Sequence, residues 1–211
     1  NTYGITGPVY YGYRAWGPNW PYVSTWVKGS STGFISDIDN AGNRFNPNKL
    51  LLDPHARQIL GRFEWRAEHH AYILDHPQGT LSYDPRDNGA QALKARVAPP
   101  DELAPGWFNR PRHAPAELVL YEVHVKGFSQ LLPAVPEALR GSYAALAHPA
   151  SIAHFKALGI TTLSLLPVQY RIDEPALAAK GLRNYWGYNT LGFFCPDPRL
   201  ATRRDDPGAV V

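Results

Sequence analysis

A nearly continuous apolar segment near the middle of the chain constrains its fold most strongly. Residues 118–128 read Leu-Val-Leu-Tyr-Glu-Val-His-Val-Lys-Gly-Phe, rich in β-branched and aromatic side chains and broken by Gly127. A run of this length with such flanks is typical of a strand buried on both faces, as in a parallel sheet. The segment therefore predicts the first strand of an α/β unit that begins in mid-chain.

The residues that follow predict a helix and a second strand. The apolar residues within 150–158 recur at the spacing of one helix face: Ile152, Phe155 and Leu158. Ser151 stands at a candidate N-cap, and Gly159 stands where such a helix would end. Residues 160–168 form a second apolar run, so the three elements predict a βαβ unit with parallel strands. Residues 169–181 are expected to form a loop.

The first half of the chain is a series of turns and short extended segments. Residues 9–16 alternate in part and predict a strand that ends at a Gly-Pro-Asn turn, and residues 44–56 contain a short apolar strand between two proline turns. Residues 98–115 hold five prolines and are predicted to be a linker. The predicted domains are therefore residues 1–97 and residues 116–211.

Composition argues against several classes of function. The net charge is +3, from 21 Lys and Arg against 18 Asp and Glu, and no basic cluster stands out, so nucleic-acid binding is not expected. No apolar run approaches the ~20 residues of a membrane-spanning helix. Cys195 is the only cysteine, which excludes an internal disulfide and a multi-cysteine metal site.

The aromatic content favours a carbohydrate ligand without requiring one. The chain has 12 Tyr and 6 Trp among 18 Gly and 20 Pro, and amphipathic aromatics on turn-rich surfaces suit polar rings such as sugars. A β-rich domain with aromatic core residues fits the same numbers, so this alternative stays open.

One aromatic run lies where a ligand site is expected. Tyr185, Trp186 and Tyr188 surround Gly187, shortly after the second predicted strand. Barrel-type folds of parallel strands place their ligand sites at the carboxyl ends of the strands. All three rings are therefore candidate substrate contacts, with Tyr188 preferred. The alternative is that Tyr185 or Trp186 only wedges the loop against the sheet.

A second candidate site lies near the N-terminus. Asp37, Asp39 and Asn43 are spaced in part like the oxygen ligands of a calcium-binding loop, but the terminal Glu of that motif is missing. An Asp/Asn/Gly turn is the alternative explanation.

Taken together, these segments resemble the isoamylase and glycogen-debranching branch of the α-amylase glycoside hydrolase family. The resemblance includes Tyr-Glu-Val-His-Val-Lys-Gly-Phe at 121–128 and Asn-Tyr-Trp-Gly-Tyr at 184–188. The other similar segments, in chain order, are 10–18, 44–54, 140–143 and 165–169. The resemblance implies an incomplete β-sandwich of the starch-binding type over 1–97, followed by the beginning of a (β/α)8 TIM barrel over 116–211.

The function that the resemblance implies is α-glucan debranching. Such a glycoside hydrolase cleaves the α-1,6 branch linkages of glycogen or amylopectin with retention, through a nucleophilic carboxylate and an acid/base carboxylate. A barrel takes ~250 residues, and in the family the catalytic acids come from later strands, so no catalytic residue is expected in this chain. Two alternatives stay open, a truncated non-catalytic glucan-binding fragment and a glucan branching enzyme.

The resemblance also implies site residues. Tyr188 matches a family tyrosine that stacks on the sugar at the cleavage subsite, and the implied partner is an α-glucan. Some relatives bind calcium, and three carboxylates are weak candidates for its ligands: Asp37, Asp173 and Asp197. Because Tyr170 and Arg171 stand where oxygen ligands would be expected, no cofactor is expected. The compartment of this bacterial-type protein, cytoplasmic or secreted, stays open.

Overall fold

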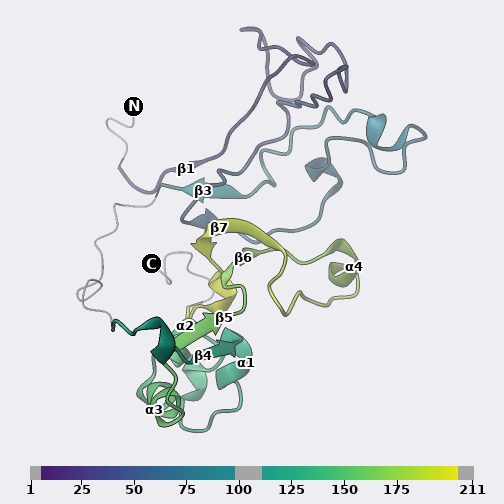
Figure 1. Ribbon diagram of the computed structural model, residues 1–211. Coiled ribbons are helices and arrows are strands. Elements are labelled where there is room, and N and C mark those ends of the chain that lie inside the picture. The colour runs from purple at the N-terminus through teal and green to yellow at the C-terminus, as the bar shows by residue number, and fades with distance from the viewer. Residues whose placement is uncertain (1–5, 98–110, 204–211) are drawn as a thin grey trace. The chain divides into compact units, whose positions relative to one another are not determined.

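The computed structural model describes residues 6–97 and 111–203 (Figure 1). The chain divides into two compact units, residues 1–97 and residues 98–211, and each is described by itself. Most of the predicted linker, residues 98–110, lies outside the described residues.

The first unit is built on a small antiparallel sheet in the order β1-β3-β2. Its strands are β1 (Tyr10–Tyr11), β2 (Ile59–Leu60) and β3 (Lys94–Arg96). Ala95 in the central strand is opposite Tyr11 on one side and Ile59 on the other, and it is fully buried. The described residues 6–97 contain this one sheet, together with two 3-10 turns, η1 (Ala67–His69) and η2 (Gly79–Leu81).

Long loops of the first unit are held by buried polar side chains. The Asn19 amide accepts a hydrogen bond from Phe45 N at 2.9 Å and donates to Ser36 O at 3.2 Å. The fully buried Trp20 ring packs edge-on against Phe34 and Tyr83 at centroid distances of 5.3 and 5.2 Å. Backbone groups without a sheet partner need such side-chain partners, since burying them unpaired is costly.

The prediction of a strand within residues 44–56 is wrong. Only an isolated bridge between Tyr13 and Leu51 forms there, and the strand expected over 9–16 shrinks to β1 plus this bridge. Asparagine side chains replace the strand ladder: Leu50 N donates to Asn88 Oδ1 at 2.6 Å. Local competition of this kind is a known property of Asn in turns.

The second unit contains the predicted βαβ arrangement. Strands β4 (Leu120–Val123) and β5 (Thr162–Leu165) are parallel, and helix α3 (Pro149–Ala157) lies between them in the sequence. The parallel pairing predicted from the two apolar runs is confirmed. The burial expected on both faces of the first run is wrong: Leu120 is 63% exposed, and Val123 is the one buried residue of β4. The remaining helical elements are short: α1 (Val125–Ser129), α2 (Tyr143–Leu146), α4 (Pro175–Ala178), η4 (Pro115–Glu117), η5 (Glu137–Leu139) and η6 (Pro198–Leu200).

The ends of α3 test two sequence predictions. His148 is the N-cap and accepts from Ala150 N, whereas Ser151 lies inside the helix, is buried and donates to Ala145 O at 2.7 Å. The predicted N-cap is therefore wrong, since Pro149 already opens the helix. Gly159 ends it as predicted, at φ +70° with its N–H bonded to Lys156 O, the geometry of a Schellman stop.

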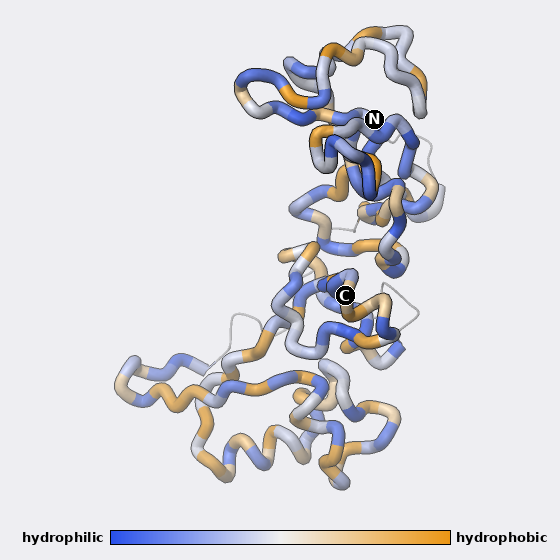
Figure 2. Tube along the Cα trace, turned by 90° about the vertical axis from the view of Figure 1, so that its right-hand side faces the viewer, coloured by the Kyte–Doolittle hydropathy of each residue, from blue (hydrophilic) through white to orange (hydrophobic). Residues whose placement is uncertain are grey.

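A second sheet of this unit corrects the loop expected at 169–181. Strand β6 (Gln169–Arg171) pairs antiparallel with β7 (Thr190–Pro196), and α4 occupies part of the remainder. Apolar residues occur in short runs along the chain, and no helix of the described segments is both long and apolar enough to cross a bilayer (Figure 2).

Candidate functional site at the ends of the parallel strands

The aromatic loop, residues 184–188, meets the carboxyl end of β4. His124 directly follows β4, and its ring stacks on Tyr185 with centroids 4.3 Å apart and planes 15° from parallel. His124 Nε2 also hydrogen-bonds Tyr185 O at 2.9 Å, while His124 Nδ1 accepts from Gly127 N at the start of α1. One histidine therefore joins strand, helix and loop.

The same loop packs against the segment that follows β5. Gly187 has φ +91°, a conformation that glycine adopts without steric cost. A Cβ at this position would lie 2.8 Å from Pro167 O and 3.1 Å from Pro167 Cβ. The aromatic loop thus sits at the carboxyl ends of both parallel strands, the edge where barrel-type folds place their ligand sites.

The three candidate rings differ in exposure. Tyr188 is 71% exposed, Trp186 60% and Tyr185 48%. Tyr185 packs one face on His124 and meets Trp186 edge-on at 6.3 Å, so it has the position that the wedging alternative describes. Tyr188 therefore has the largest exposed fraction of the three residues.

A buried ion-pair network supports the β6–β7 sheet beneath this loop. Asp197, 1% exposed, receives Arg171 Nη1 and Arg199 Nη2 on Oδ2, each at 2.9 Å. Arg199 Nη1 also reaches Asp173 Oδ1 at 3.2 Å. Burial lowers the pKa of Arg171, and the neighbouring Asp197 carboxylate opposes that shift.

The carboxylates named as calcium candidates are engaged by arginines. Asp173 and Asp197 belong to the network just described, and Asp37 of the first unit pairs with Arg44 at 2.9 Å. A guanidinium on the carboxylate opposes a second cation there. Within residues 6–97 and 111–203, no three His, Cys, Asp or Glu side chains gather in a group that could hold a metal ion.

The segment around Asp39 has the geometry of the turn alternative. Asp39 Oδ1 accepts from Ala41 N at 2.9 Å and from Asn43 N at 2.8 Å, and its Oδ2 accepts from the Asn43 side chain at 2.8 Å. These hydrogen bonds, with that from the Asn43 side chain first, lower the pKa of Asp39. They use the carboxylate oxygens that a calcium ion would need.

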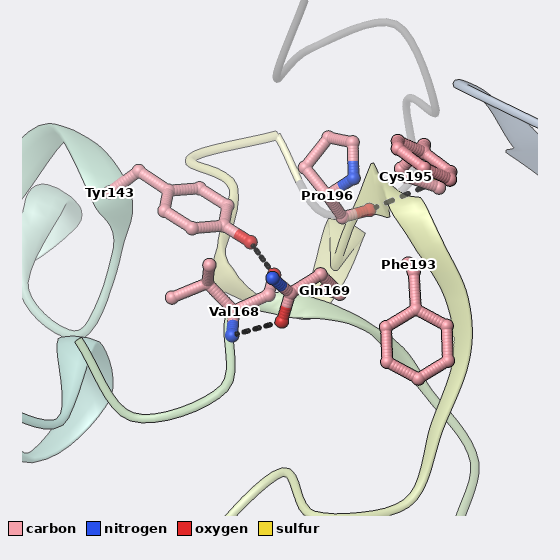
Figure 3. Close-up of a pocket in the computed structure, with 7 residues that line it drawn as sticks. Tyr143, Val168, Gln169, Phe193, Cys195 and Pro196 are labelled. Carbon is pink, nitrogen blue, oxygen red and sulfur yellow. Dashed lines mark hydrogen bonds between the residues drawn. The ribbon is translucent and has the colours of Figure 1, made fainter. Parts of the chain in front are cut away.

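A cavity of about 400 Å³ opens at the other end of the β6–β7 pair, where Gln169 is opposite Pro196 (Figure 3). Its lining residues are Tyr143, Val168, Gln169, Phe193, Phe194, Cys195 and Pro196. The Tyr143 hydroxyl donates to Val168 O at 2.5 Å and accepts from Asp197 N at 2.9 Å. Sequence reasoning did not single out this cavity, and the adjacent pair Phe193-Phe194 was the only local signal.

Alkaline pH is expected to weaken the second unit through Tyr143. Burial raises the pKa of Tyr143, and the negative charge of Asp197 adds to this shift, whereas the hydrogen bond from Asp197 N opposes it. The folded state thus favours the protonated phenol, so this stabilisation is complete below about pH 10 and is lost as pH rises toward the folded pKa. Urea unfolding from pH 8 to 11 should show a shallower alkaline decline in Tyr143→Phe than in the wild type.

Tyr143→Phe should also cost about 1 kcal/mol at neutral pH through its lost hydrogen bonds. The variant should keep some alkaline decline, since the pKa values of Tyr11 and Tyr83 in the first unit are raised to about 12. Parallel pH profiles of wild type and variant would contradict the assignment.

Comparison of sequences shows that the chain is a homologue of isoamylases and glycogen debranching enzymes. It is 47% identical to an isoamylase of Flavobacterium sp over 212 aligned positions, which cover 95% of this chain and 25% of that protein. An isoamylase of Pseudomonas amyloderamosa is 42% identical over 99% of the chain, and a glycogen debranching enzyme of Yersinia pseudotuberculosis is 43% identical over 92%. The chain spans about a quarter of the length of these relatives.

Comparison of structures finds pullulanases among the solved proteins. The GBS pullulanase SAP in complex with maltotetraose gives a TM-score of 0.48 at 20% identity, over 80% of this chain and 21% of that one. Pullulanase type I from Bacillus subtilis with maltose gives 0.47 at 23% identity, over 78% and 20%. No protein-family model matches the chain.

Proposed function

We propose that this chain is part of an isoamylase-type debranching enzyme that hydrolyses α-1,6 branch linkages of glycogen or amylopectin. The relatives at 42–47% identity supply the reaction class. One structural observation carries the role of this part: an exposed aromatic loop is fixed over the carboxyl ends of two parallel strands by His124 and Pro167. In this proposal β4 and β5 are the first two strands of a (β/α)8 barrel, and residues 1–97 belong to a β-sandwich of the starch-binding type.

The proposed role of Tyr188 follows from the chemistry of sugars. The apolar C–H face of a glucose unit can lie on the phenol ring, which is 71% exposed. Flattening of the sugar ring toward an oxocarbenium ion leaves this contact in place, so the platform serves the ground state and the transition state alike. Trp186, 60% exposed in the same loop, extends the surface for a neighbouring unit.

No residue of this chain is assigned as a catalytic acid in the proposal. Retaining hydrolysis needs two carboxylates about 5–5.5 Å apart on either side of the scissile bond. Asp173 and Asp197 are committed to arginines, and Glu174 accepts from the Asn184 side chain. In the proposal the nucleophile and the acid/base come from later barrel strands.

Hydrolysis assays separate the proposal from its two alternatives. Protein made from the complete coding sequence should raise the number of reducing ends on amylopectin and glycogen. A branching enzyme would lower the iodine staining of amylose without that rise. A non-catalytic glucan-binding protein would be retained on insoluble starch and would release nothing.

Substitution of Tyr188 by Ala in that protein should weaken maltoheptaose binding about 5- to 30-fold, or roughly 1–2 kcal/mol. The affinity falls because the stacking ring is lost, and isothermal titration calorimetry measures the change. Leu182→Ala is the matched control, because Leu182 is 55% exposed in the same segment and carries no ring. Equal affinities for wild type and Tyr188→Ala would remove Tyr188 from the site.

A further inference from the structure

Asn184 uses every polar group it has to hold the aromatic loop in shape. Its backbone N–H donates to Asp173 Oδ1 at 2.8 Å, and its carbonyl accepts from Arg171 Nε at 3.3 Å. Its side-chain Nδ2 donates to Glu174 Oε1 at 2.7 Å, and its Oδ1 accepts from Gly187 N at 2.7 Å. The side chain thus joins the start of α4 to the turn at Gly187.

The bond to Gly187 N closes the turn that precedes Tyr188. Gly187 is at φ +91° and closes the turn immediately before Tyr188. Gly187 N donates to the side-chain oxygen of Asn184, three residues earlier. The side chain here takes the place of the backbone carbonyl that accepts this hydrogen bond in an ordinary turn. A shift of Oδ1 would remove the hydrogen bond that closes this turn.

The bond to Glu174 fixes the orientation of the Asn184 amide. Glu174 Oε1 accepts from Nδ2, so the amide oxygen is turned toward Gly187. The other carboxylate oxygen, Glu174 Oε2, is buried and has no hydrogen-bond partner among the described residues. A second acceptor placed against this carboxylate would therefore meet uncompensated negative charge.

We propose that Asn184 is a positioning residue for glucan binding, whose side chain, oriented by Glu174, fixes the turn that presents Tyr188 to the sugar. The inference rests on the proposed function, in which Tyr188 stacks on an α-glucan. Asn184 itself need not touch the ligand. Its effect passes through the Gly187 turn.

Reversal of the hydrogen bond tests this role without changing the size of either side chain. In Asn184→Asp, a carboxylate oxygen replaces Nδ2 at 2.7 Å from Glu174 Oε1, and the two like charges push the side chain off Gly187 N. We expect maltoheptaose affinity to fall roughly tenfold or more in protein made from the complete coding sequence. Adding Glu174→Gln lets the glutamine amide donate to the new carboxylate, which should return the affinity to within about threefold of wild type.

The rescue separates positioning from general damage to the fold. A thermal melt of each variant records stability, and Leu182→Ala is the control for a neutral change in the same segment. Loss in Asn184→Asp with recovery in the double variant supports the inference. Wild-type affinity in Asn184→Asp, or an equal loss in the double variant, overturns it while leaving the proposed function intact. A wild-type protein that binds no maltoheptaose overturns the proposed function and this inference together.

Discussion

Replacing Asp197 by Ala should lower the free energy of unfolding of the second unit by about 3–5 kcal/mol, the usual cost of removing one partner from a buried ion pair. Arg171, 6% exposed, would keep its charge and lose the carboxylate 2.9 Å away. The substitution also removes the acceptor for Arg199 N at the start of η6, at 2.9 Å. Urea unfolding followed by near-ultraviolet circular dichroism measures the change.

The double variant Arg171→Met/Asp197→Ala identifies the cause. If the cost comes from the orphaned guanidinium, removing that guanidinium should restore part of the stability, and the double variant should be more stable than Asp197→Ala alone. Glu137→Ala, an exposed acid in the same unit, should stay within about 0.5 kcal/mol of wild type. A loss below about 1 kcal/mol in Asp197→Ala would show that the network contributes little to stability.

This network also shows what sequence reasoning could not reach. The strands β4 and β5 were predictable, because each is a short apolar run and Gly159 ends the helix between them. Strand β6 was not predictable, since Arg171 at its end reads as a loop residue. Arg171 is buried only because Asp197, 26 residues later, supplies its counter-charge. The periodicity of apolar residues reports only on positions close together in the sequence, so it cannot reveal a pairing over this distance.

The candidate site divides in a similar way. The aromatic run at 184–188 stood out from the sequence alone, and its place at the carboxyl ends of the strands followed from the predicted parallel pair. The roles of His124 and Asn184 required coordinates. His124 bonds the carbonyl of Tyr185, 61 residues later, and Asn184 bonds the carboxylate of Glu174, ten residues earlier, and neither pair has a sequence signature. Asp173 and Asp197 became calcium candidates through the family resemblance. Arg171 already argued against a cation in the sequence, but its pairing with Asp197, and that of Arg199 with Asp173, required coordinates.

Substitution of Gly187 by Ala should strongly disrupt the aromatic loop. The new Cβ would face Pro167 O at 2.8 Å, a backbone atom that cannot rotate away, and the residue would be held at φ +91°. Backbone strain and overpacking together should cost about 2–4 kcal/mol. Because the turn precedes Tyr188, we expect maltoheptaose affinity to fall at least about tenfold, measured by calorimetry on protein made from the complete coding sequence.

Gly181→Ala separates the two contributions, because Gly181 shares the positive φ, at +69°, but a methyl group added there would meet no atom within 4 Å. It should therefore carry only the left-handed backbone cost of about 1–2 kcal/mol and leave glucan affinity near that of wild type. Equal effects of the two substitutions would mean that contact with Pro167 does not hold the loop. A Gly187→Ala variant with wild-type affinity would show that the Tyr188 ring binds sugar without a fixed turn, or does not bind it.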